Sequence, residues 1–347
     1  MKERVIYADI LRVGATFLVI AIHIISRDFD LYAIDSYQWQ TLNVFDSFAR
    51  MSVPLFFMMS GIFFLDPKKA FSIRKFYKKN VFRLITSFIF WSALYAVIFT
   101  WNEYRTFDSE VWGVMVEAFK EGHFHLWFLF RMIEIYVMIP FLRKIAEDKK
   151  MILYLIAFCF YIGFILPSYH EFPVSSTVTF AERGINLDIT FGYVGYFFAG
   201  YYLAHYDLSK WVKRAIYLLG LAGLTSTIVI TSLESLKQGE HYDLPYQYLT
   251  PNVFLMSIAA FLLAKEKLHP KTVSAKFKQI LLELSAYSFG IYLVHVLIIF
   301  LLWETGITSL FSSPILSIPI LTIVVFGISY ICVKAIALLP FFKRFIL

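Results

Sequence analysis

The stretch YADILRVGATFLVIAIHIIS, residues 7–26, is an apolar run of 20 residues, about the length that an α-helix needs to cross the hydrocarbon core of a bilayer. Asp9, Arg12 and His23 interrupt it with ionisable groups. Such groups are costly at membrane depth unless they face protein or water, so they mark this helix as a candidate functional surface. The run is too long for the apolar segment of a cleavable signal peptide, and we expect it to remain in the mature protein.

Nine further apolar runs follow along the chain. Of its 347 residues, 59% are hydrophobic and only 16% are charged, which excludes an ordinary soluble domain and a disordered chain. We therefore predict an all-α, polytopic integral membrane protein of about ten transmembrane helices, folded as a single domain over residues 1–347. The predicted spans are 7–26, 46–65, 82–101, 126–145, 151–168, 189–206, 214–233, 251–265, 284–303 and 314–338.

The basic residues alternate from one side of these spans to the other. If the N-terminus is cytoplasmic, the segments on that side, with Lys334, carry 24 of the 32 Lys and Arg. The opposite loops carry five Lys and Arg but 15 of the 25 acidic residues. This asymmetry follows the positive-inside rule and predicts that both termini are cytoplasmic. The net charge of +7 thus orients the protein in the lipid bilayer, and nucleic acid is not an expected partner.

The first span carries one polar stripe. Asp9, Arg12, Thr16, Val19 and His23 are three or four residues apart, which places them on one helix face. Asp9 is expected to pair with Arg12. Arg12 and His23 are separated by about 16 Å along the axis, similar to the reach of an extended pantetheine arm, although other extended ligands fit too. His23 could serve as a general base; the alternative is a hydrogen-bonded helix contact.

Two more pairs of ionisable side chains lie within or beside the spans. Arg50 follows Asp46 by four residues at the predicted outer end of the second span, where it could form an ion pair or contact an acceptor sugar. Arg131 precedes Glu134 by three residues in the fourth span. That spacing suits an ion pair, and a contact between Arg131 and substrate is the alternative.

The ninth span carries a second polar stripe. Ser285, Ser288, Tyr292 and His295 are again three or four residues apart. Tyr292 and His295 are candidate substrate-binding residues. His295 could orient a substrate or a bound water, or it could be a hydrogen-bonded packing residue.

The sequence predicts no metal site. It contains no His-Glu-x-x-His motif and no paired cysteines at ligand spacing. His123 and His125 are two residues apart, so on a helix they would point away from each other.

Four segments together resemble a known family. They are Asp9-Ile10-Leu11-Arg12 followed after ten residues by His23, VPLFFMMSGIFFL at 53–65, HLWFLF at 125–130 and SFGIYLVH at 288–295. Over nearly its whole length the chain resembles the type-3 membrane acyltransferases. Among them it is most similar to short, stand-alone surface-polysaccharide O-acetyltransferases such as the enterobacterial common antigen O-acetyltransferase.

The resemblance implies a reaction and a set of roles. Members transfer an acyl group, usually acetyl, from cytoplasmic acetyl-CoA to a hydroxyl of a cell-surface glycan or its lipid-linked precursor, with no permanently bound cofactor. His23 would be the catalytic histidine and Arg12 part of the coenzyme A site, in a multi-pass protein of the cytoplasmic (inner) membrane. Lys78, Lys79 and Arg83 stand where the family carries basic residues of the coenzyme A site. The usual two-arginine spacing is not reproduced, and these three could equally be topology signals.

A second departure concerns the partner of the histidine. Many relatives carry paired glutamates a few residues after the tryptophan that corresponds to Trp127. Met132 and Ile133 occupy those positions here, and Glu134 follows one residue later. One residue turns a side chain by about 100° around the helix. Glu134 is nevertheless our candidate catalytic partner of His23.

Two other classes of function fit part of the sequence. A transporter or a flippase for a lipid-linked glycan would also carry intramembrane charges and interrupted helices, but the chain shows no inverted repeat. A proton-coupled sensor or a structural membrane protein would explain the ionisable stripe but not the spacing of Arg12 and His23.

Overall fold

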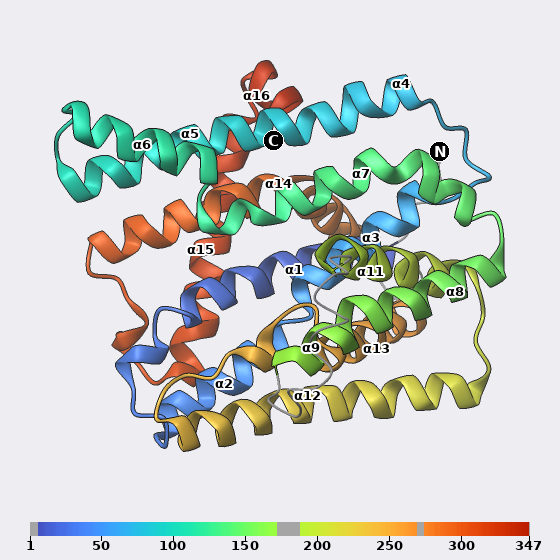
Figure 1. Cartoon of the computed structure of the whole chain (residues 1–347). Coiled ribbons are helices and arrows are strands. Elements are labelled where there is room, and N and C mark those ends of the chain that lie inside the picture. The colour runs from blue at the N-terminus through green and yellow to red at the C-terminus, as the bar shows by residue number, and fades with distance from the viewer. Residues whose placement is uncertain (1–5, 172–187, 269–273, 347) are drawn as a thin grey trace.

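The computed structural model describes residues 6–171, 188–268 and 274–346, and every regular element in these ranges is helical (Figure 1). The helices are α1 (Ile6–Ile25), α2 (Tyr37–Ala49), α3 (Ser52–Phe64), α4 (Ile73–Phe76), α5 (Phe82–Tyr104), α6 (Ser109–Glu121), α7 (Trp127–Ile145), α8 (Lys149–Phe160), α9 (Leu166–Glu171), α11 (Asp188–His205), α12 (Lys210–Gln238), α13 (Pro251–Lys267), α14 (Ala275–Glu304), α15 (Pro314–Ile336) and α16 (Pro340–Phe345). Helices α1, α5, α7, α8 and α12 run across the view in roughly parallel or antiparallel directions, whereas α15 is steeply inclined to them and α11 is seen nearly end-on (Figure 1).

The predicted multi-pass, all-α architecture is confirmed. Among the described residues, nine segments are long and apolar enough to cross a membrane, from Ile6–Leu31 to Pro314–Ile336. The remaining predicted span, 189–206, coincides with α11, which has 18 residues. Three glycines and four tyrosines make α11 less apolar than the other spans. The side chains of Tyr193, Tyr196 and Tyr201 are buried, so α11 is surrounded by protein rather than by lipid.

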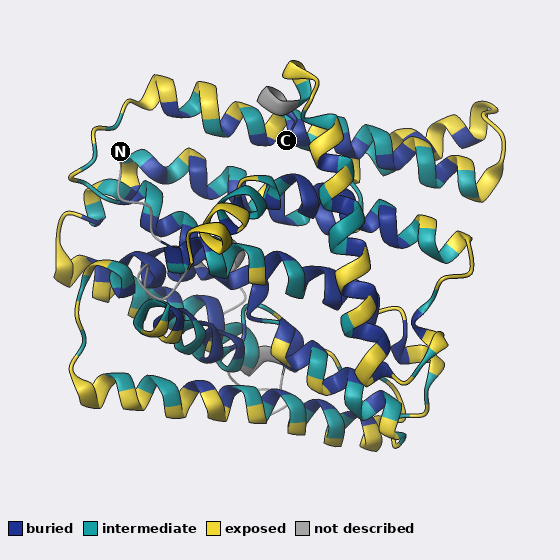
Figure 2. Ribbon diagram, turned by 180° about the vertical axis from the view of Figure 1, so that it is seen from behind, coloured by how far each residue is buried: buried dark blue, intermediate teal, exposed yellow. Residues whose placement is uncertain are grey.

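Exposed apolar side chains cover the outside of the bundle. Figure 2 shows that buried residues fill the interior and that exposed residues gather on the outermost helices. On α12, Leu218, Leu221 and Leu233 are each at least 60% exposed. A soluble monomer rarely exposes so much contiguous apolar surface, whereas acyl chains solvate leucine well.

Helices α3 and α11 cross at very close range. A Cβ atom added to Gly61 of α3 would lie 1.9 Å from the carbonyl oxygen of Phe197, and one added to Gly200 of α11 would lie 2.2 Å from that of Met58. Small residues let helix backbones approach each other in membranes. Both glycines are therefore required by this crossing, which holds α3 against the centre of the bundle.

The path from α6 to α7 is broken inside the protein. Gly122 has a φ of 75°, which L side chains rarely adopt, and a 3₁₀ turn (η3, Phe124–Leu126) precedes Trp127, where α7 begins. Irregular backbone at membrane depth is tolerated where it is buried in protein or lines a cavity. This break places His125 in the interior of the bundle, with the half-buried His123 beside it.

Helix α1 lies inside the bundle and contacts α2, α3, α13, α14 and α15. Helix α14 packs along α1 with the polar stripes of the first and ninth predicted spans facing each other: Ser285 bonds Arg12 and Asp9, and the rings of His23 and His295 are in contact.

Candidate functional site

Arg12 is held at the contact between α1 and α14. Its Nη1 donates a hydrogen bond to Ser285 Oγ at 3.1 Å, and Ser285 Oγ donates to Asp9 Oδ1 at 2.5 Å. The same Nη1 lies 3.8 Å from Asp9 Oδ1, so the predicted Asp9–Arg12 ion pair is confirmed. The Arg12 side chain is still 28% exposed, because its guanidinium borders a cavity.

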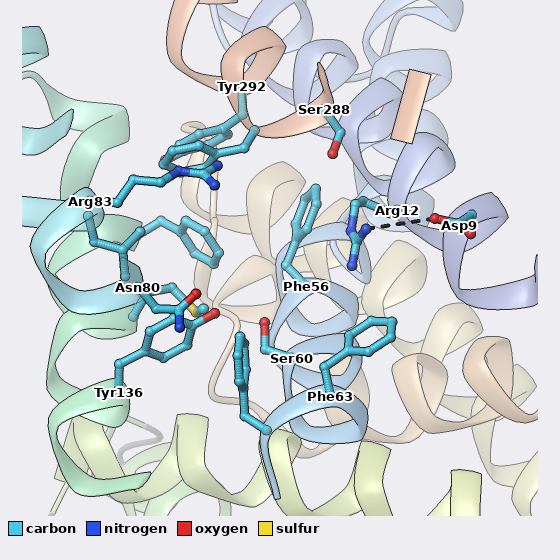
Figure 3. Close-up of a pocket in the computed structure, with 15 residues that line it drawn as sticks. Asp9, Arg12, Phe56, Ser60, Phe63, Asn80, Arg83, Tyr136, Ser288 and Tyr292 are labelled. Atoms are coloured by element: carbon cyan, nitrogen blue, oxygen red, sulfur yellow. Dashed lines mark ion pairs between the residues drawn. The ribbon is translucent and has the colours of Figure 1, made fainter. Parts of the chain in front are cut away.

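This cavity, which we call the inner cavity, has a volume of about 450 Å³. Arg12 reaches it from one side and Arg83 from the other (Figure 3). Polar groups of Asn80, Ser60 and Tyr136 also line it. Its remaining walls are largely aromatic. The Arg12 guanidinium lies 5.5 Å from the ring centroid of Phe63, and the Arg83 guanidinium lies 5.1 Å from the ring centroid of Phe289. The inner cavity thus combines two cations and the carboxylate of Asp9 with a mostly apolar lining.

A second, basic cavity of about 570 Å³ adjoins the inner cavity and shares Phe63, Phe64 and Asn80 with it. Lys79 lines this cavity, together with Lys69, Lys75 and Arg143. Lys78 is exposed. Lys75 and Arg143 were not among the sequence candidates, because a basic residue beside a span is first a topology signal.

His23 borders a different cavity, which we call the outer cavity. Its volume is about 330 Å³, and its lining includes Ser26, Arg27, Phe99 and Phe124. The Arg27 guanidinium lies 3.8 Å from the ring centroid of Trp303. The outer cavity lies at the end of α1 that the charge distribution assigns to the outer side.

Three further histidines gather around His23. The ring centroid of His23 lies 5.1 Å from that of His295 and 6.4 Å from that of His125. His125 and His295 lie 5.6 Å apart, and His123 Nδ1 lies 3.0 Å from His125 Nδ1. The sequence did not reveal this cluster, because the four histidines come from three separate segments.

The prediction that His123 and His125 point away from each other is wrong. It assumed a continuous helix, whereas both residues precede α7. The turn after Gly122 folds their rings together. Within the described ranges, no group of three or more His, Cys, Asp or Glu has an arrangement that could hold a metal ion.

A partition of side chains separates the two cavities. Phe128 and Tyr292 line the inner cavity, with their ring centroids 5.4 Å apart. The Tyr292 hydroxyl donates a hydrogen bond to the backbone carbonyl of His125. The ring of Tyr292 also lies 5.8 Å from that of His295, which contacts His23. Tyr292, Phe128 and His125 therefore stand between the inner cavity and the ring of His23.

Arg131 and Glu134 form an ion pair with a distance of 2.9 Å between Nη1 and Oε2. The interpretation of this spacing as an ion pair is confirmed. Neither residue belongs to the lining of the inner or the outer cavity, as far as the chain is described. The role of Glu134 as the partner of His23 stays a prediction.

Asp46 and Arg50 also form the predicted ion pair. Asp46 is 0% exposed, and the Arg50 guanidinium lies 4.5 Å from the ring centroid of Tyr246. A contact between Arg50 and an acceptor sugar stays a prediction.

Comparison with known proteins identifies the family of the chain. A family model described as an acyltransferase domain matches residues 5–334, which include both polar stripes, both cavities and the partition. The comparisons with curated proteins and with solved structures give no match. Because the matched range spans nearly the whole chain, the protein belongs to the type-3 acyltransferase family and is a multi-pass membrane acyltransferase.

Proposed function

We propose that the protein is an O-acetyltransferase that moves an acetyl group from cytoplasmic acetyl-CoA to a hydroxyl of a cell-surface polysaccharide or a lipid-linked glycan. The observation that carries the proposal is the position of Arg12 and His23 on one helix, each beside a different cavity. The donor would occupy the inner cavity and the acceptor hydroxyl the outer cavity, in the cytoplasmic membrane.

The chemistry of the inner cavity suits acetyl-CoA. The nucleotide part of acetyl-CoA is a polyanion. Positive charge in and beside the cavity is supplied by Arg12, Arg83 and Lys79. The pantetheine arm is uncharged and partly apolar, which suits the aromatic walls. An arm that passes from Arg12 along α1 would bring its thioester to the partition.

His23 supplies the base that the reaction requires. The acceptor oxygen attacks the thioester carbonyl carbon while its proton passes to a ring nitrogen of His23. The tetrahedral intermediate then collapses, the carbon–sulfur bond breaks, and the proton passes from His23 to the departing sulfur. The products are the acetyl ester and coenzyme A with a free thiol. The Tyr292 side of the partition must move for the thioester to reach His23.

The proposal is tested by transfer of label. Membranes of the source cells that contain the protein are incubated with acetyl-CoA carrying a ¹⁴C-acetyl group, and alkali-labile label is counted in the envelope glycan fraction. Label above that of membranes without the protein supports the proposal. If the protein is folded and no label is transferred, the function is not acetyl transfer, and movement of a lipid-linked glycan across vesicles becomes the next assay.

Replacing Arg12 with alanine is expected to weaken acetyl-CoA binding about 10- to 100-fold, because a hydrogen-bonded charge beside the donor phosphates is lost. The measurement is the thermal shift of the purified protein in detergent against acetyl-CoA concentration. Arg214→Ala is the control: its guanidinium lies over Trp211 on α12 and faces neither cavity among the described residues. Equal affinity in both variants and the native protein would remove Arg12 from the donor site.

A further inference from the structure

The surroundings of His295 determine which of its ring nitrogens carries a proton. Its Nδ1 lies 2.6 Å from the backbone carbonyl oxygen of Tyr292. A carbonyl oxygen can only accept a hydrogen bond, so Nδ1 must be the nitrogen that donates. In the neutral ring, Nε2 then carries a lone pair and is an acceptor.

The Nε2 atom of His295 has no hydrogen-bond partner among the residues that the structure describes. The residue is 0% exposed, so bulk water does not compensate for the missing bond. A second proton would place a positive charge on a buried ring beside the rings of His23 and His125. A buried acceptor without a donor costs free energy and requires an explanation.

Of the rings that contact His295, that of His23 lies closest and can supply the missing donor, while that of His125, whose Nε2 also lacks a partner among the described residues, lies 5.6 Å away. The ring centroid of His23 lies 5.1 Å from that of His295, and the ring planes are inclined by 35°. A small rotation or one bridging water closes such a gap. When His23 takes the proton of the acceptor hydroxyl, both of its nitrogens carry N–H groups. One of them faces the reaction, and the other needs an acceptor.

We infer that His295 is the positioning residue of His23. Its Nε2 accepts a hydrogen bond from the N–H of His23, directly or through one water. That bond holds the unprotonated nitrogen of His23 toward the acceptor hydroxyl and stabilises His23 while it carries the extra proton. His295 itself stays neutral, and the proton continues from His23 to the departing thiolate. The inference rests on the proposed function.

The inference explains how His23 can act although Met132 and Ile133 stand where many relatives carry paired glutamates. The nearest carboxylate along that helix, Glu134, is paired with Arg131. By contrast, no residue of the described chain forms a hydrogen bond with His295 Nε2. A histidine from α14 thus provides the acceptor that a carboxylate from α7 would otherwise provide.

Two substitutions at position 295 separate this role from packing. His295→Leu removes both ring nitrogens, and we expect the apparent kcat of acetyl transfer to fall about 10- to 100-fold, the effect of losing one hydrogen bond to a charged group. The KM for acetyl-CoA should change by no more than about twofold, because this interaction acts in the transition state. His295→Gln returns an acceptor oxygen near Nε2 and should be faster than the leucine variant.

A double variant tests whether the two histidines act together. Residues that act as a unit are not additive, so His23→Ala combined with His295→Leu should be no slower than His23→Ala alone. The control is His205→Leu. In the native chain the Nδ1 of His205 also bonds a backbone carbonyl oxygen, that of Tyr201, at 2.9 Å. The His205→Leu variant should keep native activity. Thermal unfolding and acetyl-CoA binding are recorded for every variant.

The inference is overturned if His295→Leu keeps the native kcat, if His295→Gln is no faster than His295→Leu, or if the double variant loses the product of the two single effects. In these cases, a lower rate of acetyl transfer in the His23→Ala variant still supports the proposed function. If the native protein transfers no acetyl group, both the function and the inference fail.

Discussion

Replacing His23 with alanine is expected to slow acetyl transfer about 10²- to 10⁴-fold, the range that a positioned general base contributes. The His23 ring lies beside the outer cavity and contacts the rings of His125 and His295. Acetyl-CoA binding should remain close to native, because Arg12 and Arg83 lie in the inner cavity on the other side of the partition. The measurement is the rate of label transfer at saturating acetyl-CoA, together with the thermal shift that reports binding.

His205→Ala is the matched control, since this histidine lies at the end of α11 and lines neither cavity in the described part of the chain. It should transfer acetyl at the native rate. If His23→Ala retains full activity in folded protein, His23 is not the base. A loss of activity together with a loss of acetyl-CoA binding would instead indicate a disturbed fold.

Replacing Gly200 with valine is expected to have the largest effect on stability. The new Cβ would lie 2.2 Å from the carbonyl oxygen of Met58 and 2.5 Å from its Cα. These are backbone atoms, so no flexible side chain can move aside, and α3 and α11 must separate. Overpacking of this kind costs about 3 kcal/mol or more. The measurement is the unfolding temperature of the detergent-purified protein.

The same substitution should also weaken acetyl-CoA binding, because α3 carries Phe56, Ser60 and Phe63 of the inner cavity. Gly327→Ala on α15 is the control, since a Cβ there meets nothing within 4 Å. It should be neutral or slightly stabilising, by up to about 1 kcal/mol, because alanine favours a helix more than glycine does. Native stability in Gly200→Val would show that the crossing of α3 and α11 is not as tight as described.

The spans and several local ion pairs could be predicted from the sequence because both depend on near neighbours. Apolar runs of bilayer length define the helices, and spacings of three or four residues join Asp9 to Arg12 and Asp46 to Arg50. The two polar stripes were recognised in the same way. That they face each other follows from the contact of α1 with α14, which no local spacing reveals.

The arrangement of the histidines could not be predicted, because it depends on a backbone break and on helix packing. Helical spacing placed His123 and His125 on different faces, whereas the turn after Gly122 puts their ring nitrogens 3.0 Å apart. His23 and His295 are 272 positions apart in the chain. A glycine that breaks the path between two apolar segments was the available signal, but it does not reveal which residues the break approaches.

The partition between the cavities also matters for the membrane that contains the enzyme. A continuous wet passage from one aqueous phase to the other would conduct protons and small ions and dissipate the gradients that the cell maintains. With Tyr292 bonded to the carbonyl of His125 and packed against Phe128, the inner and outer cavities share no lining residue in the described part of the chain and are separated by this partition. In the proposed reaction, the side chains that must yield to the thioester are the ones that keep the two cavities apart between turnovers.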